Sequence, residues 1–240
     1  MTGRRRIRGG YPLALAAVLG AWAALTGVVG VVAPPAAAQP CPDVEVVFAR
    51  GTGEPPGVGG IGQAFVDAVR AQAAPRSVGV YAVNYPAGDN FADRIGFAST
   101  VVDGIRDEGD HIQAMAANCP DTRLVLGGYS QGAVVSGFVT SAEVPPGVPV
   151  ESVPAPLPPE VADNVAAVVL FATPSAQFLR QFGAPAIDIG PLYAPKTLQL
   201  CDAGDSICSG VAGGGPNIAH ALYAVNGAVN EGAAFAVGRL

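Results

Sequence analysis

Short apolar runs alternate with longer helical patterns along this chain, and that alternation limits the possible fold more than any other feature of the sequence. The runs at 44–49 and 165–171 are apolar on both faces, as strands are when helices cover both sides of a parallel sheet. The predicted strands are residues 44–49, 78–83, 124–126, 165–171 and 197–200, and the predicted helices are residues 60–72, 92–117, 133–140 and 218–236. The sequence therefore predicts an α/β fold with a central, mostly parallel sheet of about five strands flanked by helices.

The first 38 residues differ in composition from the rest of the chain. Four arginines within the first eight positions precede an uncharged apolar stretch at 11–32, which is followed by small residues up to Ala38. This arrangement predicts a secretory signal peptide, residues 1–38, cleaved after Ala38, and the twin arginines also allow twin-arginine export. An uncleaved membrane anchor is the alternative, because about 20 apolar residues can cross a bilayer. Residues 39–240 are expected to form a single domain.

The net charge excludes several classes of binding partner. Without residues 1–38, nine of the 13 basic residues remain beside all 19 acidic ones, so the net charge is −10. A domain this acidic repels nucleic acid and offers no basic surface to anionic lipid headgroups. Because half of the residues are hydrophobic and only 13% are charged, a disordered chain is excluded as well.

All four cysteines, Cys41, Cys119, Cys201 and Cys208, lie beyond the predicted signal peptide. An even number of cysteines in an oxidising compartment indicates disulfides, and four cysteines allow three pairings. The short spacing between Cys201 and Cys208 favours a local bridge, which would leave Cys41 to pair with Cys119. A zinc site is the alternative, but the spacings do not match those of CxxC knuckles, and no metal is expected.

Residues 142–160, called the Pro-rich loop below, interrupt the alternation of strands and helices. Seven of them are prolines, which excludes a helix or a central strand: Pro145, Pro146, Pro149, Pro154, Pro156, Pro158 and Pro159. The sequence predicts a semi-rigid extended loop, which is either a surface spacer or a flap near the mouth of a site.

Gly128-Tyr129-Ser130-Gln131-Gly132 has the pattern G-x-S-x-G between a predicted buried strand and a predicted helix. In that setting a sharp turn lifts the serine hydroxyl above the sheet, and a Cβ two positions to either side would collide with its neighbours. The N–H of Gln131, at the helix N-terminus, would point at a developing oxyanion. The pattern predicts a nucleophile at Ser130, and an ordinary glycine-rich turn is the alternative.

A serine nucleophile needs a base, and the chain has two histidines. His111 lies in a polar stretch and is predicted to be a solvated helix residue, whereas His220 lies at the start of the final predicted helix. The chain order serine, acid, histidine of α/β-hydrolases selects His220. The acidic candidates between the two are Glu143, Glu151, Glu160, Asp163, Asp188, Asp202 and Asp205. Asp205 is favoured because it follows a predicted strand inside a loop flanked by two cysteines, and Asp202 in the same loop is the alternative.

A second oxyanion donor is expected in the loop after the first strand. Arg50-Gly51-Thr52-Gly53 occupies that position, so the backbone N–H of Thr52, with help from its hydroxyl, is the candidate. A phosphate-binding loop is disfavoured, because the third glycine of G-x-G-x-x-G and a Walker lysine are both missing from this segment.

The acyl pocket should be apolar. Its candidate lining residues are the Pro-rich loop, Ala172-Thr173-Pro174, Phe178, Leu179 and Phe182. For the last three, ordinary core packing is an equal interpretation, because large apolar residues are usually buried.

Together these segments resemble the cutinase family, the small secreted serine esterases of fungi and actinobacteria. The resemblance rests on Cys41-Pro42-Asp43 leading to Phe48-Ala49-Arg50-Gly51-Thr52, on the G-x-S-x-G segment, on Cys201 to Cys208 around Asp205, and on His220 with Tyr223. It covers nearly all of residues 39–240. It implies a cutinase-like α/β-hydrolase fold, a triad of Ser130, Asp205 and His220, an oxyanion hole at Thr52 and Gln131, and the bridges Cys41–Cys119 and Cys201–Cys208.

The resemblance also implies a secreted, monomeric carboxylic ester hydrolase that needs no cofactor and acts on esters of fatty acids, with transient contact to a lipid interface. Bacterial cutinase-like proteins range over esterases, lipases and phospholipases, so a phospholipase or thioesterase with the same triad is an alternative. A non-catalytic cell-envelope protein on the same fold is a second alternative.

Overall fold

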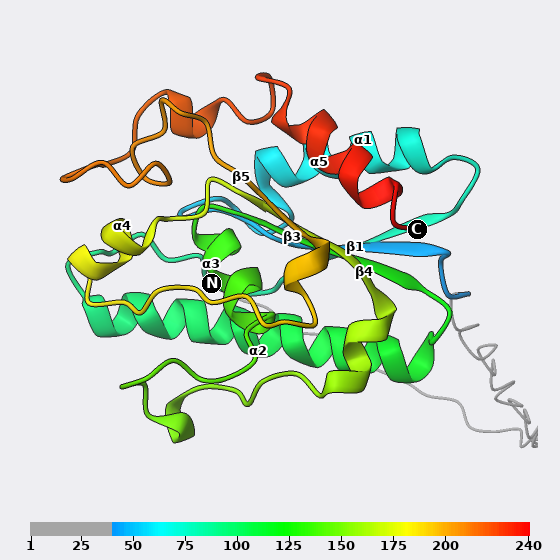
Figure 1. Cartoon of the computed structure of the whole chain (residues 1–240), viewed down its shortest axis with the longest axis horizontal. Coiled ribbons are helices and arrows are strands. Elements are labelled where there is room, and N and C mark those ends of the chain that lie inside the picture. Colours follow the sequence, from blue (N-terminus) through cyan, green and yellow to red (C-terminus); the bar gives the residue numbers. More distant parts are fainter. Residues whose placement is uncertain (1–39) are drawn as a thin grey trace, which may run out of the picture. The chain divides into compact units, whose positions relative to one another are not determined.

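The computed structural model describes residues 40–240 (Figure 1). The predicted signal peptide, residues 1–38, and its cleavage site after Ala38 lie outside the described residues. In the described part of the chain, no helix has both the length and the apolar composition needed to cross a membrane.

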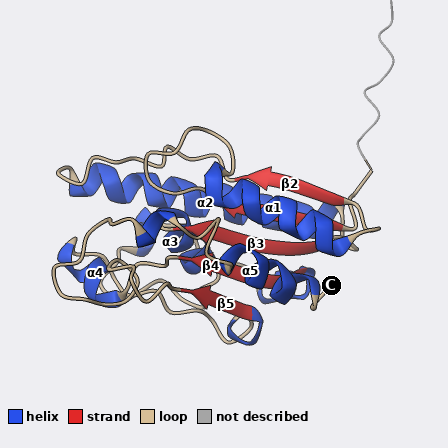
Figure 2. Ribbon diagram, turned by 90° about the horizontal axis from the view of Figure 1, so that it is seen from above, coloured by secondary structure: helices blue, strands red, loops and turns tan. Residues whose placement is uncertain are grey.

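Five parallel strands form the central sheet (Figure 2), in the order β2-β1-β3-β4-β5. Their bounds are β1 (Val44–Ala49), β2 (Val78–Ala82), β3 (Arg123–Tyr129), β4 (Val165–Phe171) and β5 (Thr197–Leu200). The predicted α/β fold is confirmed. Because all five strands run in the same direction, their carboxyl ends meet at one edge of the sheet, where open α/β sheets bind ligands.

Helices cover both faces of the sheet. α1 (Gly59–Ala73) and α5 (Ala228–Val237) lie on one face, and α2 (Arg94–Asn118) and α3 (Gln131–Val139) lie on the other (Figure 1). The short helix α4 (Ala176–Gln181) lies beside the carboxyl ends of the strands (Figure 2). Since α2 follows β2 and precedes β3, it begins at the carboxyl edge of the sheet and returns the chain to the amino edge.

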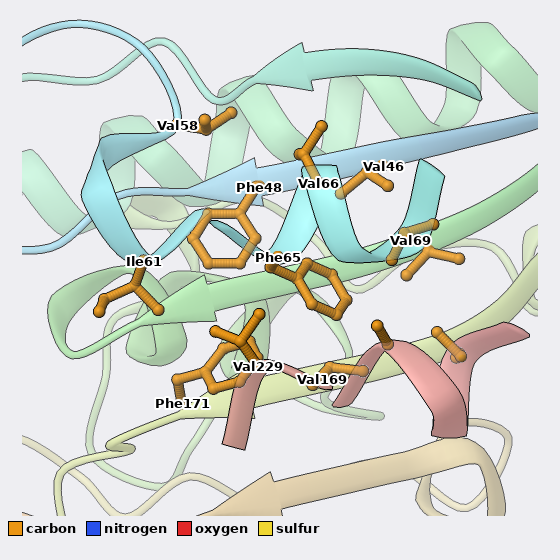
Figure 3. Close-up of a cluster of buried hydrophobic side chains, with 14 of the residues drawn as sticks. Val46, Phe48, Val58, Ile61, Phe65, Val66, Val69, Val169, Phe171 and Val229 are labelled. Atoms are coloured by element: carbon orange, nitrogen blue, oxygen red, sulfur yellow. The ribbon is translucent and has the colours of Figure 1, made fainter. Parts of the chain in front are cut away.

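Two apolar clusters, one on each side of the sheet, form the core. Val46 and Phe48 of β1 lie in the cluster that includes α1 and α5, and Val47 lies in the cluster that includes α2 and α3, because side chains of a strand point alternately to opposite faces. In the first cluster, Phe48 packs with Phe65 and Phe171 (Figure 3), and the ring centroids of Phe65 and Phe171 are 5.4 Å apart. Burial on both faces explains why β4 is apolar throughout and β1 is apolar except at Glu45.

The prediction of a final helix over residues 218–236 is wrong for the first half of that range. The structure has a single 3₁₀ turn at Ala219–Ala221, and α5 begins only at Ala228. Gly227 between them has a φ of 95°, a left-handed conformation that ends a regular helix and that glycine adopts at low cost. His220 therefore lies in a short turn and not at the start of a long helix.

The prediction that His111 is a solvated helix residue is also wrong. Its side chain is only 18% exposed, and its Nε2 lies 2.7 Å from Oε2 of Glu45. The imidazole also stacks on the ring of Tyr81, with centroids 3.4 Å apart. Both partners come from strands that the polar sequence around His111 does not reveal.

Candidate active site

Ser130 lies in the tight turn between β3 and α3. Its φ of 53° and ψ of −114° are unusual for a residue with a side chain, and strain of this kind concentrates at functional sites. A Cβ on Gly128 would collide with the backbone of Gly132, and a Cβ on Gly132 would collide with the carbonyl of Ala49. The two glycines therefore allow the strand, the turn and the helix to pack closely enough to form this turn.

His220 lies directly beside the serine. Its Nε2 is 2.9 Å from Oγ of Ser130, and its Nδ1 is 2.8 Å from Oδ2 of Asp205. The 3₁₀ turn that carries His220 is held by Asn217, whose Oδ1 accepts a hydrogen bond from the His220 N–H at 3.2 Å. The structure thus brings together three residues that are far apart in the sequence, in the geometry of a nucleophile, a base and an orienting acid.

Asp205 is fully buried and accepts three hydrogen bonds. Besides Nδ1 of His220, the hydroxyl of Tyr223 donates to Oδ2 at 2.9 Å, and the N–H of Ile207 donates to Oδ1 at 2.9 Å. The alternative acid, Asp202, instead accepts hydrogen bonds from the N–H of Gly204 and the side chain of Asn226. Of the two candidate acids, Asp205 is the one whose carboxylate contacts His220.

Disulfides hold both edges of the sheet. Cys201–Cys208 closes the loop that carries Asp205, and Cys41–Cys119 joins the segments before β1 and β3. The first bridge lies at the carboxyl edge with the candidate site, and the second lies at the amino edge.

Tyr223 is a residue of the site to which the sequence analysis assigned no role. It is fully buried, and its hydroxyl accepts a hydrogen bond from the N–H of Asp202 at 2.9 Å while donating to Asp205. Burial, together with this donation to a carboxylate, raises the pKa of Tyr223 above its ordinary value, so the hydroxyl stays protonated and remains a donor at neutral pH. Its position three residues after His220 is the signal that could have pointed to it.

The loop after β1 carries Thr52, which lines the same cavity as Ser130 and Gln131. Glu54 holds this loop in shape, because its two carboxylate oxygens accept hydrogen bonds from the N–H groups of Gly51, at 2.6 Å, and Gly60, at 2.8 Å. The sequence analysis missed Glu54.

Arg50, which the sequence analysis also left without a role, supports the same loop from beneath. Its guanidinium is buried and donates to the carbonyls of Glu54, Val83 and Tyr85. Several charge-assisted hydrogen bonds of this kind are what a buried guanidinium requires. The loop is therefore joined to the segment after β2.

A cavity of about 1180 Å³ opens over Ser130 and His220. Its lining includes three residues that were predicted either as pocket or as core: Phe178, Leu179 and Phe182. The ring of Phe182 packs on that of Phe91, with centroids 5.5 Å apart. Of the predicted segment Ala172-Thr173-Pro174, Pro174 lines the cavity, whereas Ala172 is buried in the core. Residues 143–145 and 152–157 of the Pro-rich loop, with Val148 between them, also line it, so this loop borders the candidate site.

The comparisons with known proteins agree with the observed fold. The family model described as Cutinase matches residues 40–240. The chain is 65% identical over 170 residues to "Probable carboxylesterase Culp7" of Mycobacterium tuberculosis, covering 71% of this chain and 89% of that protein. It is 47% identical over 208 residues to "Phospholipase Culp4" of the same organism, covering 87% and 83%.

Solved structures show the same architecture. A cutinase of Trichoderma reesei in complex with a phosphonate inhibitor matches with a TM-score of 0.62 and 33% identity, over 83% of this chain and 77% of that chain. The catalytic core of an acetyl xylan esterase from Trichoderma reesei matches with a TM-score of 0.65 and 28% identity, over 84% of this chain and all of that chain.

Proposed function

This chain belongs to the cutinase family and is a carboxylic ester hydrolase, and from that premise we propose that it cleaves esters of fatty acids through Ser130, His220 and Asp205. The observation that carries the proposal is the continuous chain of hydrogen bonds from Oγ of Ser130 through the imidazole to the buried carboxylate, at 2.9 and 2.8 Å.

Each residue has a defined part in the proposed reaction. His220 removes the proton of Ser130 through Nε2 as Oγ attacks the ester carbonyl, and Asp205 holds the tautomer that has its proton on Nδ1. His220 then gives that proton to the leaving alcohol, and an acyl group remains on Ser130. Water, deprotonated by the same histidine, releases the acid and restores the serine.

The oxyanion of the tetrahedral intermediate is assigned to the backbone N–H groups of Gln131 and Thr52. Gln131 is the first residue of α3, where backbone N–H groups lack partners within the helix and the helix dipole favours negative charge. Thr52 borders the same cavity in the loop that Glu54 holds. Loss of one such donor costs about 10²–10³ in rate.

We also propose that the chain is exported with residues 1–38 as a cleaved signal peptide, by the Sec or the twin-arginine route. Two disulfides support this proposal, because such bonds persist in oxidising compartments. The protein is proposed to act as a monomer, since one chain supplies all three proposed catalytic residues. The exposed side chains of Phe91 and Ile95 beside the cavity support brief contact with a lipid surface.

The test of the proposed triad is Ser130→Ala, assayed on p-nitrophenyl butyrate. Turnover should fall by at least about 10⁴-fold, because the nucleophile is lost while the fold keeps its backbone. Ser77→Ala, at the amino edge of the sheet, is the matched control and should hydrolyse the ester as the wild type does. Retained turnover in Ser130→Ala would overturn the assignment.

A phospholipase activity is the second candidate, because one relative that spans most of this chain is named a phospholipase. Release of fatty acid from phosphatidylcholine vesicles, lost in Ser130→Ala, would support it. The non-catalytic alternative is tested by a fluorophosphonate probe, which reacts with an activated serine. Folded wild-type protein that remains unlabelled would favour that alternative.

A further inference from the structure

The cavity over Ser130 extends along one face of α2, beneath the Pro-rich loop. Of the 13 residues of α2 that line the cavity, four aliphatic or glycine residues are spaced by four, three and four positions and so share one face of the helix: Ala98, Val102, Ile105 and Gly109. The Pro-rich loop, which follows α3 and runs past α2 in Figure 1, contributes the facing wall: Val144, Val148, Val153 and Leu157. The part of the cavity between these two sets of residues is called the α2 groove below.

The α2 groove leads away from the candidate catalytic residues. α2 begins at the carboxyl edge of the sheet, where Ser130 lies. Ala98, near the start of the helix, is therefore closer to that edge than Gly109 is. A separation of 11 positions along the helix corresponds to about 16 Å. The groove and the candidate site belong to one cavity of about 1180 Å³, which exceeds the roughly 300–1,000 Å³ of ordinary small-molecule pockets.

The outer wall of the groove is stiff. Its prolines restrict the backbone to extended conformations, and the hydrogen bonds of its central part are local ones, from Val148 to the carbonyl of Pro145 and from Ser152 to that of Pro149. Beyond this wall, Leu157 packs against the core cluster and approaches Gly109, with 3.8 Å between its Cδ2 and the position of a Cβ on the glycine. The two walls of the groove therefore approach each other at Gly109.

Charged side chains of α2 also line the cavity, namely Arg94, Asp103, Arg106 and Asp110. Asp103 and Arg106 of α2 form an exposed ion pair with 3.2 Å between nitrogen and oxygen. The four residues on the α2 side and the four on the facing wall are all aliphatic or glycine. A ligand that matches these walls is long, unbranched and uncharged, because burial of apolar surface is the interaction that they offer.

We propose that the α2 groove binds a long, unbranched acyl chain of the ester whose carbonyl Ser130 attacks. The proposal rests on the proposed function and narrows its substrate class to esters of long-chain fatty acids, in preference to acetyl or butyryl esters. Short acyl groups would leave most of the groove filled with water.

The test is kcat/KM for p-nitrophenyl acetate, butyrate, octanoate, dodecanoate and palmitate, each below its critical micelle concentration. For the wild type, kcat/KM should increase with the length of the acyl chain, by up to about fourfold for each methylene that enters the groove. Ala98→Trp should lower the ratio of the palmitate to the butyrate value by at least about tenfold, because the indole fills the groove near its entrance. Gly109→Leu should lower kcat/KM for the palmitate ester. It should leave the ratio of the octanoate to the butyrate value as in the wild type.

The matched control is Ala114→Trp, which changes an exposed alanine of the same helix that does not line the cavity. Its chain-length profile should equal that of the wild type. A flat wild-type profile, or equal profiles for Ala98→Trp and Ala114→Trp, would overturn the groove proposal. The proposed triad would stand in either case if butyrate hydrolysis is lost in Ser130→Ala, so the two failures are distinguishable.

A binding measurement complements the kinetics without requiring turnover. Ser130→Ala should bind a fluorescent long-chain fatty acid, and the double variant that also carries Ala98→Trp should bind it at least about tenfold more weakly. Equal affinity in the two variants would contradict the proposal.

Discussion

At the scale of single residues, the Asp205 carboxylate shows how the proposed triad is held. Its three hydrogen-bond donors come from the turn that carries His220, from Tyr223 and from the backbone of its own loop. A carboxylate fixed from three directions cannot turn away from the imidazole. Tyr223 acts only through Asp205 and is a positioning residue.

Tyr223→Phe tests this role. It removes one donor to Asp205 and leaves the N–H of Asp202 without its partner, so kcat for p-nitrophenyl butyrate should fall by about tenfold with KM little changed. Urea unfolding of the same variant separates a loss of position from a loss of fold. A variant with wild-type kcat would show that the other two donors are sufficient.

Single residues also show what could be inferred from the chain alone. Ser130, His220 and Asp205 could be proposed because a local motif and the order along the chain select them. The contacts of Arg50 and His111 could not be predicted, since their partners are carbonyls and a carboxylate contributed by distant strands and loops. Contacts between distant segments leave no local pattern in the sequence.

At the scale of elements, a buried carboxyl group joins α2 to α3. Glu108 is fully buried, and burial raises its pKa well above the ordinary value, which favours the protonated form. Its Oε2 lies 3.0 Å from Oγ of Ser136, which lies 3.0 Å from the carbonyl of Gly127 in β3. Since the serine has one proton to donate, the protonated Glu108 donates to Ser136 and Ser136 donates to Gly127, which links both helices to the strand that leads to Ser130.

Glu108→Gln should therefore change how stability depends on pH. In the wild type, the raised folded-state pKa stabilises the fold fully at low pH, and this contribution is lost as the pH rises from the ordinary pKa of glutamate to the raised one. Within that window the loss is about 1.4 kcal/mol per pH unit. The glutamine variant lacks this contribution, so urea unfolding at a series of pH values should show a shallower decline. Parallel curves for both proteins would contradict the assignment.

The elements differ in how well their sequence predicts them. The bounds of β1 and β4 agree with the apolar runs, because burial on both faces favours nearly continuous apolar sequence. The bounds of the edge strand β5 also agree, although it contains the exposed Gln199. The final helix does not, since the apolar spacing of 218–236 continues through Gly227, whereas the chain before Ala228 forms only a 3₁₀ turn at Ala219–Ala221 and further turns. Turns in place of the first half of the predicted helix do not alter the hydrophobic pattern.

At the scale of the whole molecule, the two disulfides stabilise different parts of the structure. Cys41–Cys119 links segments 78 residues apart at the amino edge of the sheet, whereas Cys201–Cys208 closes a short loop around Asp205. On the chain-entropy account, the longer loop contributes about 4.5 kcal/mol and the shorter about 2.5 kcal/mol to the free energy of unfolding.

Removing each bridge separately tests this division. Cys41→Ala/Cys119→Ala should lose more stability in urea, up to about 4.5 kcal/mol, yet keep kcat/KM for butyrate near the wild-type value. Cys201→Ala/Cys208→Ala should lose less stability and more activity, because the loop that carries Asp205 is released. Equal losses of activity in the two variants, measured where both are folded, would contradict the separation.

The Pro-rich loop joins α3 to β4 and contributes no strand to the sheet. An insertion or deletion within it would leave the register of every strand pair unchanged, and the turn that carries Ser130 would also keep its place. After gene duplication, descendants of such a chain could therefore diverge in the ester that they accept by drift in the length of one loop, while the reaction itself is inherited unaltered.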